Sequence, residues 1–483
     1  MNKKSAILAL YPERIGQRVF DRMPPLGLAW IAAVLRDSGY PVRLVDEQVE
    51  KIELVTLVEE LKPALFLIGG TSHSRFDAFD RADTVKNVYP QATVVYGGPH
   101  ASFTAESILS HIPGIDIVVR GEGEHAILDL IVWKTSGGVT GELSRIPGIS
   151  FRLNGRTTST EPRPFSQNLD NLPLPARDLL PIKRYELTLE YLDKPAMHII
   201  TARGCPFGCS FCSASKMFGR SYAMRSPALV VDEIEELVRS YGIEGVKIFD
   251  STFTISRSHV LGFCDELERR GLVMPWECEV RAGTLNKQML ERMREAGCYY
   301  MDIGIESGDQ SVLDRMNKGI KLRDVEDLLH WCHELGIRTK AFFTVGHIGE
   351  TPEAGARTIS FIKNNRKFIT LIGYNPGIRI YPGTRVEEFA RENDLLPEGF
   401  DWSLPYENQQ YLRIYRPVDN VPLLLQPRMG ISDLRRLRQK YILSRIVSPA
   451  FLLFKMKLLL KNRELGKYLS IAFRGMLKAF RRG

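Results

Sequence analysis

The sequence contains no long apolar run. None of its stretches reaches the about 18 apolar residues that a membrane-spanning helix needs. Residues 1–10 are basic and then apolar, but the apolar part is short and lacks a cleavage-site pattern, which favours a first strand over a secretion signal. Cysteine is also scarce: seven residues in 483, without a signal sequence, indicate a reducing compartment. We therefore expect a cytoplasmic protein.

Residues 1–444 together carry almost no net charge. The whole chain carries +8 at pH 7, but residues 445–483 hold ten Lys or Arg against one acid and contribute +9. The basic balance therefore belongs to the tail and does not indicate a nucleic-acid-binding protein. Within the tail, cations alternate with bulky apolar residues, which predicts a basic amphipathic helix. Such a helix either makes peripheral contact with anionic lipid at the inner face of the membrane or packs on the rest of the protein.

Three cysteines form the most specific pattern in the chain. Cys205, Cys209 and Cys212 follow the spacing Cys-x3-Cys-x2-Cys. A structural zinc site needs four protein ligands, and the nearest candidates, His198 and Cys264, do not lie at finger spacing. Three thiolates suit an iron–sulfur cluster, and a four-iron cubane would keep one iron open to a small molecule. The pattern predicts a 4Fe-4S cluster with these three cysteines as metal ligands.

At 483 residues the chain is long enough for two or three domains. Its first part alternates short strands with helices, which indicates a parallel sheet covered on both faces, with ligands at the carboxyl ends of the strands. Strands are expected at 5–10, 42–46, 64–70, 93–98 and 115–120, and helices at 26–38, 52–61 and 76–88. Small or polar residues follow three of these strands, where glycine would let a flat ligand approach the backbone. The residues expected at this rim, unless they form ordinary strand-to-helix turns, are Thr71, Ser72, His73, Gly97, Gly98, Gly121, Glu122 and Gly123.

A second series of strands and helices begins at residue 198. Six strands are expected, at 198–201, 245–250, 277–281, 299–306, 338–345 and 371–381. A proline-rich stretch before them is interpreted as a stiff connector. The predicted division of the chain is 5–140, 141–197 (the connector), 198–400 and 401–483.

The cysteine loop, with an aromatic residue before its last cysteine, resembles the signature of the radical S-adenosylmethionine (SAM) enzymes. The segment Pro24-Pro25-Leu26-Gly27-Leu28, the pair Gly97-Gly98 and the run Gly121-Glu122-Gly123-Glu124 resemble the cobalamin-binding domain that precedes many radical SAM cores. The resemblance covers residues from about 5 to 385. It implies an α/β fold with an N-terminal doubly wound parallel-sheet cobalamin-binding domain, a partial (β/α)6 TIM-type barrel and a helical basic C-terminal segment. The implied cofactors are the 4Fe-4S cluster, SAM and cobalamin.

The resemblance also implies a reaction. In that superfamily the open iron binds SAM, and one electron breaks its sulfonium bond to give methionine and a 5′-deoxyadenosyl radical. Here the radical would modify an unactivated carbon, most simply by methyl transfer. Cyclisation or rearrangement without methyl transfer, as in the anaerobic magnesium-protoporphyrin monomethyl ester cyclase, is an alternative, and a non-catalytic cobalamin or cluster sensor is a remote one. The expected partners are a small, hydrophobic or lipid-like substrate and an electron donor such as flavodoxin or ferredoxin.

Charged or small residues at the ends of the barrel strands are the candidate SAM contacts. Asp250 would lie near the methionine portion, and Arg281 could bind the SAM carboxylate through two hydrogen bonds. Glu306 suits the ribose hydroxyls, and Gly346 would let the backbone approach the adenine. The alternative for each charged residue is an exposed or locally paired side chain.

One departure from the resemblance concerns cobalt. Cobalamin domains of the methionine-synthase type supply a histidine ligand from the loop after the first strand, but residues 11–17 contain no histidine. His73 follows the third strand, where lining the pocket or capping a helix is the more ordinary role. We expect cobalamin without a strong protein base, a difference that would alter the redox behaviour of cobalt.

Overall fold

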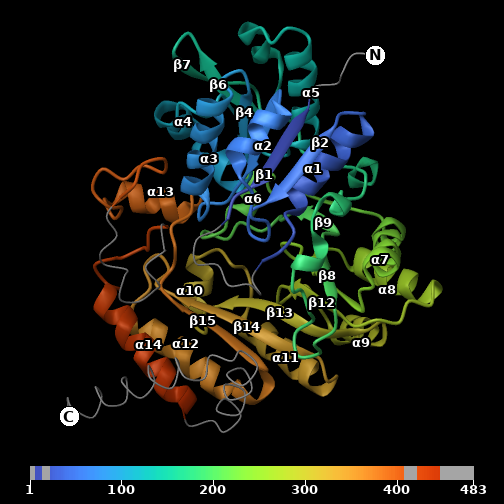
Figure 1. Ribbon diagram of the computed structural model, residues 1–483. Helices are drawn as coiled ribbons and strands as arrows, with labels where there is room; N and C mark the ends of the chain where they lie inside the picture. The colour runs from blue at the N-terminus through green and yellow to red at the C-terminus, as the bar shows by residue number, and fades with distance from the viewer. Residues whose placement is uncertain (1–5, 14–21, 407–420, 447–483) are drawn as a thin grey trace, which may run out of the picture.

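The computed structural model describes residues 6–13, 22–406 and 421–446. It contains two large sheets, one in the N-terminal part and one in the part that follows (Figure 1). The first sheet has seven strands in the order β2-β1-β3-β4-β5-β6-β7. These are β1 (Ile7–Tyr11), β2 (Val42–Asp46), β3 (Leu65–Gly69), β4 (Thr93–Gly97), β5 (Ile117–Val119), β6 (Ile149–Leu153) and β7 (Arg156–Ser159). The chain passes from β1 to β2 on one side and then crosses to β3 on the other side of β1. The switch point therefore lies between β1 and β3, where ligands of such sheets bind.

Helices cover both faces of the first sheet because alternate strand residues point to opposite sides. On β1, Ile7 and Ala9 pack into the same core as α1 (Leu26–Asp37) and α5 (Glu124–Thr135). Leu8 and Leu10 of the same strand point into the other core. The helices on that side are α2 (Leu54–Leu61), α3 (Arg75–Val88) and α4 (Pro99–His111). The predicted doubly wound arrangement is therefore confirmed.

Part of the predicted connector belongs to the first sheet. Strands β6 and β7 form a hairpin, and β6 pairs antiparallel with β5. Asn154 and Gly155 both have positive φ, as an Asn-Gly hairpin turn requires. The first sheet therefore continues past residue 140, the boundary expected from the sequence, up to Ser159. The rest of the connector runs through short 3₁₀ turns between the two domains.

The second sheet has six parallel strands in the order β15-β14-β13-β12-β11-β8, as the sequence predicts. The strands are β8 (Ala196–Ile199), β11 (Gly245–Ile248), β12 (Trp276–Val280), β13 (Cys298–Glu306), β14 (Arg338–Val345) and β15 (Leu371–Pro376). Intervening helices are α7 (Pro227–Tyr241), α8 (Arg257–Arg269), α9 (Lys287–Glu295), α10 (Gln310–Arg315), α11 (Leu322–Glu334) and α12 (Pro352–Asn364). β8 and β15 are edge strands that do not pair with each other, so the barrel is partial.

The C-terminal part contacts both domains. α13 (Arg385–Glu392) lies near the first domain in Figure 1, and α14 (Ile431–Ile446) packs on α12 and β15. Arg75 of the first domain donates from Nε to the Trp402 carbonyl at 2.8 Å. No helix among the described residues is long and apolar enough to cross a membrane. From residue 447 onward, the predicted basic tail lies outside the described residues.

Candidate active site

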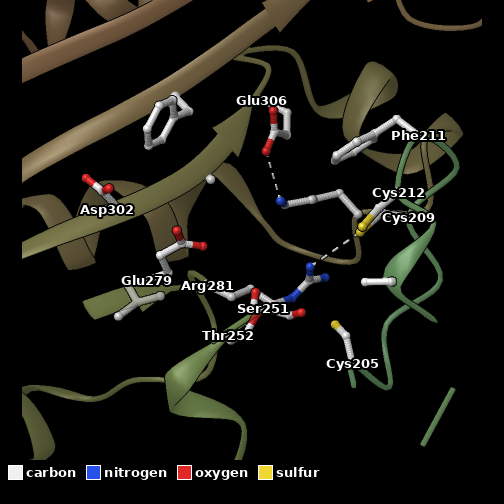
Figure 2. Close-up of a pocket in the computed structure, with 15 residues that line it drawn as sticks. Cys205, Cys209, Phe211, Cys212, Ser251, Thr252, Glu279, Arg281, Asp302 and Glu306 are labelled. Carbon is white, nitrogen blue, oxygen red and sulfur yellow. Dashed lines mark hydrogen bonds and ion pairs between the residues drawn. The ribbon is translucent and has the colours of Figure 1, made fainter. Parts of the chain in front are cut away.

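A cavity of about 320 Å³ lies at the carboxyl ends of the barrel strands, with the three motif cysteines at one end (Figure 2). This is the edge where parallel barrels carry their chemistry. Its lining residues come from the cysteine loop, from β11 to β14 and from the turn after α10. They are Cys205, Cys209, Phe211, Cys212, Ala214, Ser251, Thr252, Glu279, Val280, Arg281, Asp302, Gly304, Glu306, Lys318 and Phe342.

The cysteine loop begins directly after β9 (Ala202–Gly204) and ends at α6 (Ala214–Met217). The strand that follows α6, β10 (Tyr222–Met224), pairs antiparallel with β9 and so closes the base of the loop. Gly204 has φ +90°, and a Cβ there would lie 2.2 Å from the Ser221 carbonyl oxygen, so only glycine fits. The turn after α10 supports the loop from the other side. The Ser210 amide donates to the Met316 carbonyl at 2.9 Å, and the Asn317 side-chain amide donates to the Gly208 carbonyl at 2.9 Å.

The three motif thiols are not arranged around a single metal ion. No group of three or more His, Cys, Asp or Glu within the described ranges is arranged to hold one ion. In a cubane each thiolate binds a different iron, so the sulfur atoms need not meet at one point. Burial raises the pKa of the Cys205 and Cys212 thiols. A backbone hydrogen bond to each thiol and the charge of Lys318 partly offset this for both, and the charge of Arg281 does so for Cys205. Binding of metal would therefore release protons from these thiols.

Arg281, at the end of β12, provides a fixed cation beside the thiols. It is buried, with Nη1 3.7 Å from the Cys209 sulfur and its guanidinium carbon 3.8 Å from the centre of the Phe207 ring. Stacking on an aromatic ring holds the planar guanidinium in one orientation. Its remaining N–H groups can bind an anionic ligand. Figure 2 shows the guanidinium between the sulfur atoms and the far end of the cavity.

Glu306, at the end of β13, enters the cavity through an irregularity in the strand. Its φ is +72°, and the register with β14 shifts between Gly304 and Glu306. Lys318 Nζ lies 3.2 Å from the carboxylate and holds it in place. Lys318 was not among the sequence predictions, because it lies in a turn outside any motif and reaches the site only through the packing of α10.

Two further carboxylates, Glu279 and Asp302, line the end of the cavity opposite the cysteines (Figure 2). They are register partners on β12 and β13 and so point to the same side. Burial is the main cause that raises the pKa of Glu279 to about 7 and that of Asp302 to about 6. For Glu279, the negative charge of Asp302 raises the pKa further. Sequence reasoning missed both, although polar residues at every second position along both strands were a usable signal.

The four predicted SAM contacts divide into two pairs. Arg281 and Glu306 line the cavity, whereas Asp250 and Gly346 do not belong to the set of described residues that line it. Asp250 accepts hydrogen bonds from the Thr201 and Ala202 amides at 2.7 and 3.1 Å, and burial raises its pKa to about 6. It therefore supports the backbone that leads into the cysteine loop.

Gly346 serves packing at the end of β14. Its φ is +97°, and a Cβ there would lie 3.4 Å from both the Gly377 Cα and a Leu434 methyl carbon. Its amide donates to the Glu350 carboxylate at 2.8 Å. The expected contact of its backbone with adenine stays a prediction.

The predicted cobalamin rim is assembled at the ends of β3, β4 and β5, but several of its side chains already have partners. Gly98 has φ +107°, and a Cβ there would lie 2.6 Å from the Gly70 carbonyl oxygen, so the two loops touch through backbone. Ser72 Oγ lies 3.0 Å from His100 Nδ1. His73 Nε2 lies 3.0 Å from the Tyr381 hydroxyl of the barrel domain, which does not favour a role as cobalt ligand.

Comparison with known proteins agrees with this arrangement. The model of the Radical SAM superfamily matches residues 199–362, and that of the B12 binding domain matches residues 15–131. The uncharacterized methyltransferase PH0819 of Pyrococcus horikoshii is 31% identical over 463 residues, covering 95% of this chain and 94% of the relative. The chain belongs to the radical SAM enzymes that carry a B12-binding domain. The predicted family is thus confirmed, together with SAM and cobalamin as cofactors.

Other members of this radical SAM group differ in their named reactions. The anaerobic magnesium-protoporphyrin IX monomethyl ester cyclase of Cereibacter sphaeroides is 30% identical, and the alignment covers 70% of this chain and 56% of the cyclase. The hopanoid C-3 methylase of Methylococcus capsulatus is 32% identical over 66% of this chain, which spans 60% of the methylase. The chain is therefore an enzyme, and nothing in these comparisons supports the sensor alternative.

Solved structures confirm the fold of the radical SAM and B12-binding domains. TsrM from Kitasatospora setae, with cobalamin and a [4Fe-4S] cluster bound, superimposes with a TM-score of 0.72 at 19% identity over 92% of both chains. OxsB, with aqua-cobalamin and S-adenosylmethionine bound, gives a TM-score of 0.73 at 16% identity over 90% of this chain and 66% of OxsB. At these identities the similarity is one of architecture.

Proposed function

We propose that the protein is a cobalamin-dependent radical SAM methyltransferase acting on an unactivated carbon of a small molecule. The observation that carries the proposal is the cavity in which three thiols meet two cations, Arg281 and Lys318, at the carboxyl ends of the barrel strands. Methyl transfer is favoured because the relative that matches nearly the whole chain is named a methyltransferase.

In this proposal Cys205, Cys209 and Cys212 hold a 4Fe-4S cluster with one open iron. Arg281 binds the SAM carboxylate, because its guanidinium is already fixed beside the cluster end of the cavity. Glu306, held by Lys318, accepts hydrogen bonds from the ribose hydroxyls. Glu279 and Asp302 face the opposite end, where acceptor groups select hydrogen-bond donors on the bound molecules.

The N-terminal rim holds cobalamin mainly through backbone. Gly97, Gly98, Gly121 and Gly123 contribute backbone to the rim, with open space beside Gly121, and residues 71–73 form the third loop of the rim. Cobalamin is expected without a histidine ligand, because the His73 imidazole bonds Tyr381.

The overall reaction has a defined balance. When bound, the cluster supplies the electron that cleaves SAM, and cobalamin carries the methyl group. The substrate exchanges one hydrogen for one methyl group. Two SAM molecules and two electrons are consumed, and one S-adenosylhomocysteine, one methionine and one 5′-deoxyadenosine are released. Neither SAM nor substrate supplies these electrons, so an external donor such as flavodoxin or ferredoxin is part of the proposal.

Isotope-labelled SAM tests the reaction type. Anaerobically reconstituted protein with cobalamin, methyl-deuterated SAM and reduced flavodoxin should form both 5′-deoxyadenosine and S-adenosylhomocysteine, measured by mass spectrometry. A chemical reductant in place of flavodoxin is the control for the electron donor. Formation of 5′-deoxyadenosine without S-adenosylhomocysteine would favour the cyclase-type alternative. Absence of 5′-deoxyadenosine with either reductant would refute radical SAM chemistry.

We also propose that the basic tail gives peripheral contact with anionic membrane surfaces. Residues 445–483 carry nine net positive charges among bulky apolar residues, and each cation near such a surface can add about 1 kcal/mol of binding free energy. Truncation after Ile446 preserves α14, whose Leu434, Leu437 and Tyr441 are buried against the barrel domain. A hydrophobic or lipid-like substrate would be consistent with this location.

Vesicle sedimentation checks the tail proposal. Full-length protein should sediment with anionic vesicles, less so as salt rises, and the form lacking residues 447–483 should stay in solution with its cluster intact. Equal sedimentation with neutral vesicles would contradict the electrostatic part of the proposal. Loss of the cluster in the truncated form would show instead that the tail is structural.

A further inference from the structure

Arg203, two residues before Cys205, is bound by the cobalamin-binding domain. Its Nη1 lies 2.9 Å from Glu122 and its Nη2 lies 2.6 Å from Glu124, both in the segment that follows β5. The side chains of Arg203, Glu122 and Glu124 are 12%, 11% and 6% exposed. The guanidinium carbon also lies 4.8 Å from the centre of the Trp30 ring on α1. The first domain thus surrounds an arginine of the barrel domain, and we call this contact the Arg203 clamp.

The Arg203 clamp lies only a few residues from each of the two proposed cofactor sites. On the barrel side, β9 ends at Gly204 and leads directly into Cys205. On the other side, Glu122 lies between the two rim glycines, and its second carboxylate oxygen accepts the Ser166 amide at 2.7 Å. A shift of the rim loop would therefore displace the start of the cysteine loop, because a buried arginine held by two carboxylates and an aromatic ring tolerates little displacement.

A second anchor holds the start of the cysteine loop. Asp250 holds the amides of Thr201 and Ala202 from within the barrel. Between this anchor and the clamp, the backbone entering the loop is fixed from both domains. The geometry points to Arg203 as a positioning residue that couples the two sites, so that binding of cobalamin strengthens binding of the cluster and the reverse. Such coupling is reciprocal by thermodynamic necessity.

The inference rests on the proposed function in one respect: cluster and cobalamin must occupy these two sites. Measurements of cobalamin binding test the inference without any catalytic turnover. The dissociation constant of hydroxocobalamin is measured by anaerobic ultrafiltration with the full-length chain, once with its reconstituted cluster and once without. The wild type should bind cobalamin more tightly with the cluster present, by a factor of about 5–150, the usual range of coupling between sites. In Arg203→Gln the ratio should fall to near one, and Arg203→Lys should give an intermediate ratio because it keeps the charge and loses the fork.

A matched control separates coupling from general loss of an arginine. Arg270 is 14% exposed and contacts Asp232, Glu235 and Glu266 on the outer helices of the barrel, so Arg270→Gln should keep the wild-type ratio. If Arg203→Gln does not fold, Glu124→Gln weakens the clamp from the other domain and should also lower the ratio. Equal affinities in the wild type, or an unchanged ratio in Arg203→Gln and Glu124→Gln, would overturn the inference. Failure of the wild type to bind either cofactor would instead refute the proposed function.

Discussion

Replacement of Cys205, Cys209 or Cys212 by alanine is expected to abolish reductive SAM cleavage. Each variant removes one of three thiolates that share a single cluster, and the described cavity offers no other thiol as a substitute. Iron content after reconstitution should fall from about four atoms per chain to near zero, and 5′-deoxyadenosine should become undetectable. Iron analysis, the optical spectrum and product mass spectrometry together measure the effect.

Cys332 provides the control for this experiment. It is fully buried on α11, outside the cavity lining, and behaves as a small apolar residue. Cys332→Ala should therefore lower stability modestly while retaining the cluster and SAM cleavage. Normal 5′-deoxyadenosine formation by any of the three motif variants would contradict the assignment of the cluster ligands.

The largest expected loss of stability follows from replacing Glu233 by glutamine. Glu233 on α7 is buried between two arginines, Arg177 of the connector and Arg225 after β10, with side chains 1%, 3% and 7% exposed. Arg177 Nη1 lies 2.6 Å from the Glu233 carboxylate, and Arg177 also donates to the His198 carbonyl on β8 at 3.0 Å. The variant would leave two buried arginines without their counter-charge, which costs about 3–5 kcal/mol in the free energy of unfolding. Denaturant unfolding followed by circular dichroism measures this.

The stabilisation by the ion pairs of Glu233 with the two arginines depends on pH with a definite sign. Burial alone would raise the pKa of Glu233, but the charges of Arg177 and Arg225 lower it below its usual value. A lowered folded-state pKa contributes stability above the unfolded-state pKa, and this contribution disappears as the pH falls through the folded-state pKa. The difference between wild type and Glu233→Gln should therefore shrink in acid.

Glu236→Gln is the matched control on the same helix. Glu236 pairs with Arg239 at the surface, where the side chains are 38% and 75% exposed. Such a pair contributes roughly 0–1 kcal/mol, so this variant should unfold almost like the wild type. A similarly small effect of Glu233→Gln would show that the connector does not depend on the buried ion pairs.

The connector illustrates what a local pattern can and cannot predict. Its prolines predict a stiff segment, but the contacts that tie it to both domains depend on partners far away in the sequence. Trp30 Nε1 donates to the Pro173 carbonyl at 3.1 Å, and Arg177 reaches Glu233 in the barrel domain. Neither partner is marked by any local signal, because buried pairing becomes visible only when the two domains are folded together.

The sequence by itself determined the architecture and placed three cysteines together on one loop. Alternation of strand and helix depends on local periodicity, and five of the six barrel strands were therefore predicted within two residues of their observed bounds. The sixth was predicted over 371–381, whereas β15 ends at Pro376. The three cysteines share one short loop, so their spacing alone predicted a cluster. Arg281 and Glu306 were found because strand ends in a parallel barrel share one edge.

Only the tertiary structure decided which other residues meet the site. Lys318 arrives from a turn after α10, and Glu279 and Asp302 meet because β12 and β13 lie side by side in register. Asp250 and Glu122 were predicted as cofactor contacts from their positions at strand ends, yet they bind the backbone and the arginine that lead into the cysteine loop. A charged residue at a strand end has the same local sequence in either role. Its partner is chosen by burial and by the packing of one domain on the other, which depend on contacts between distant parts of the chain.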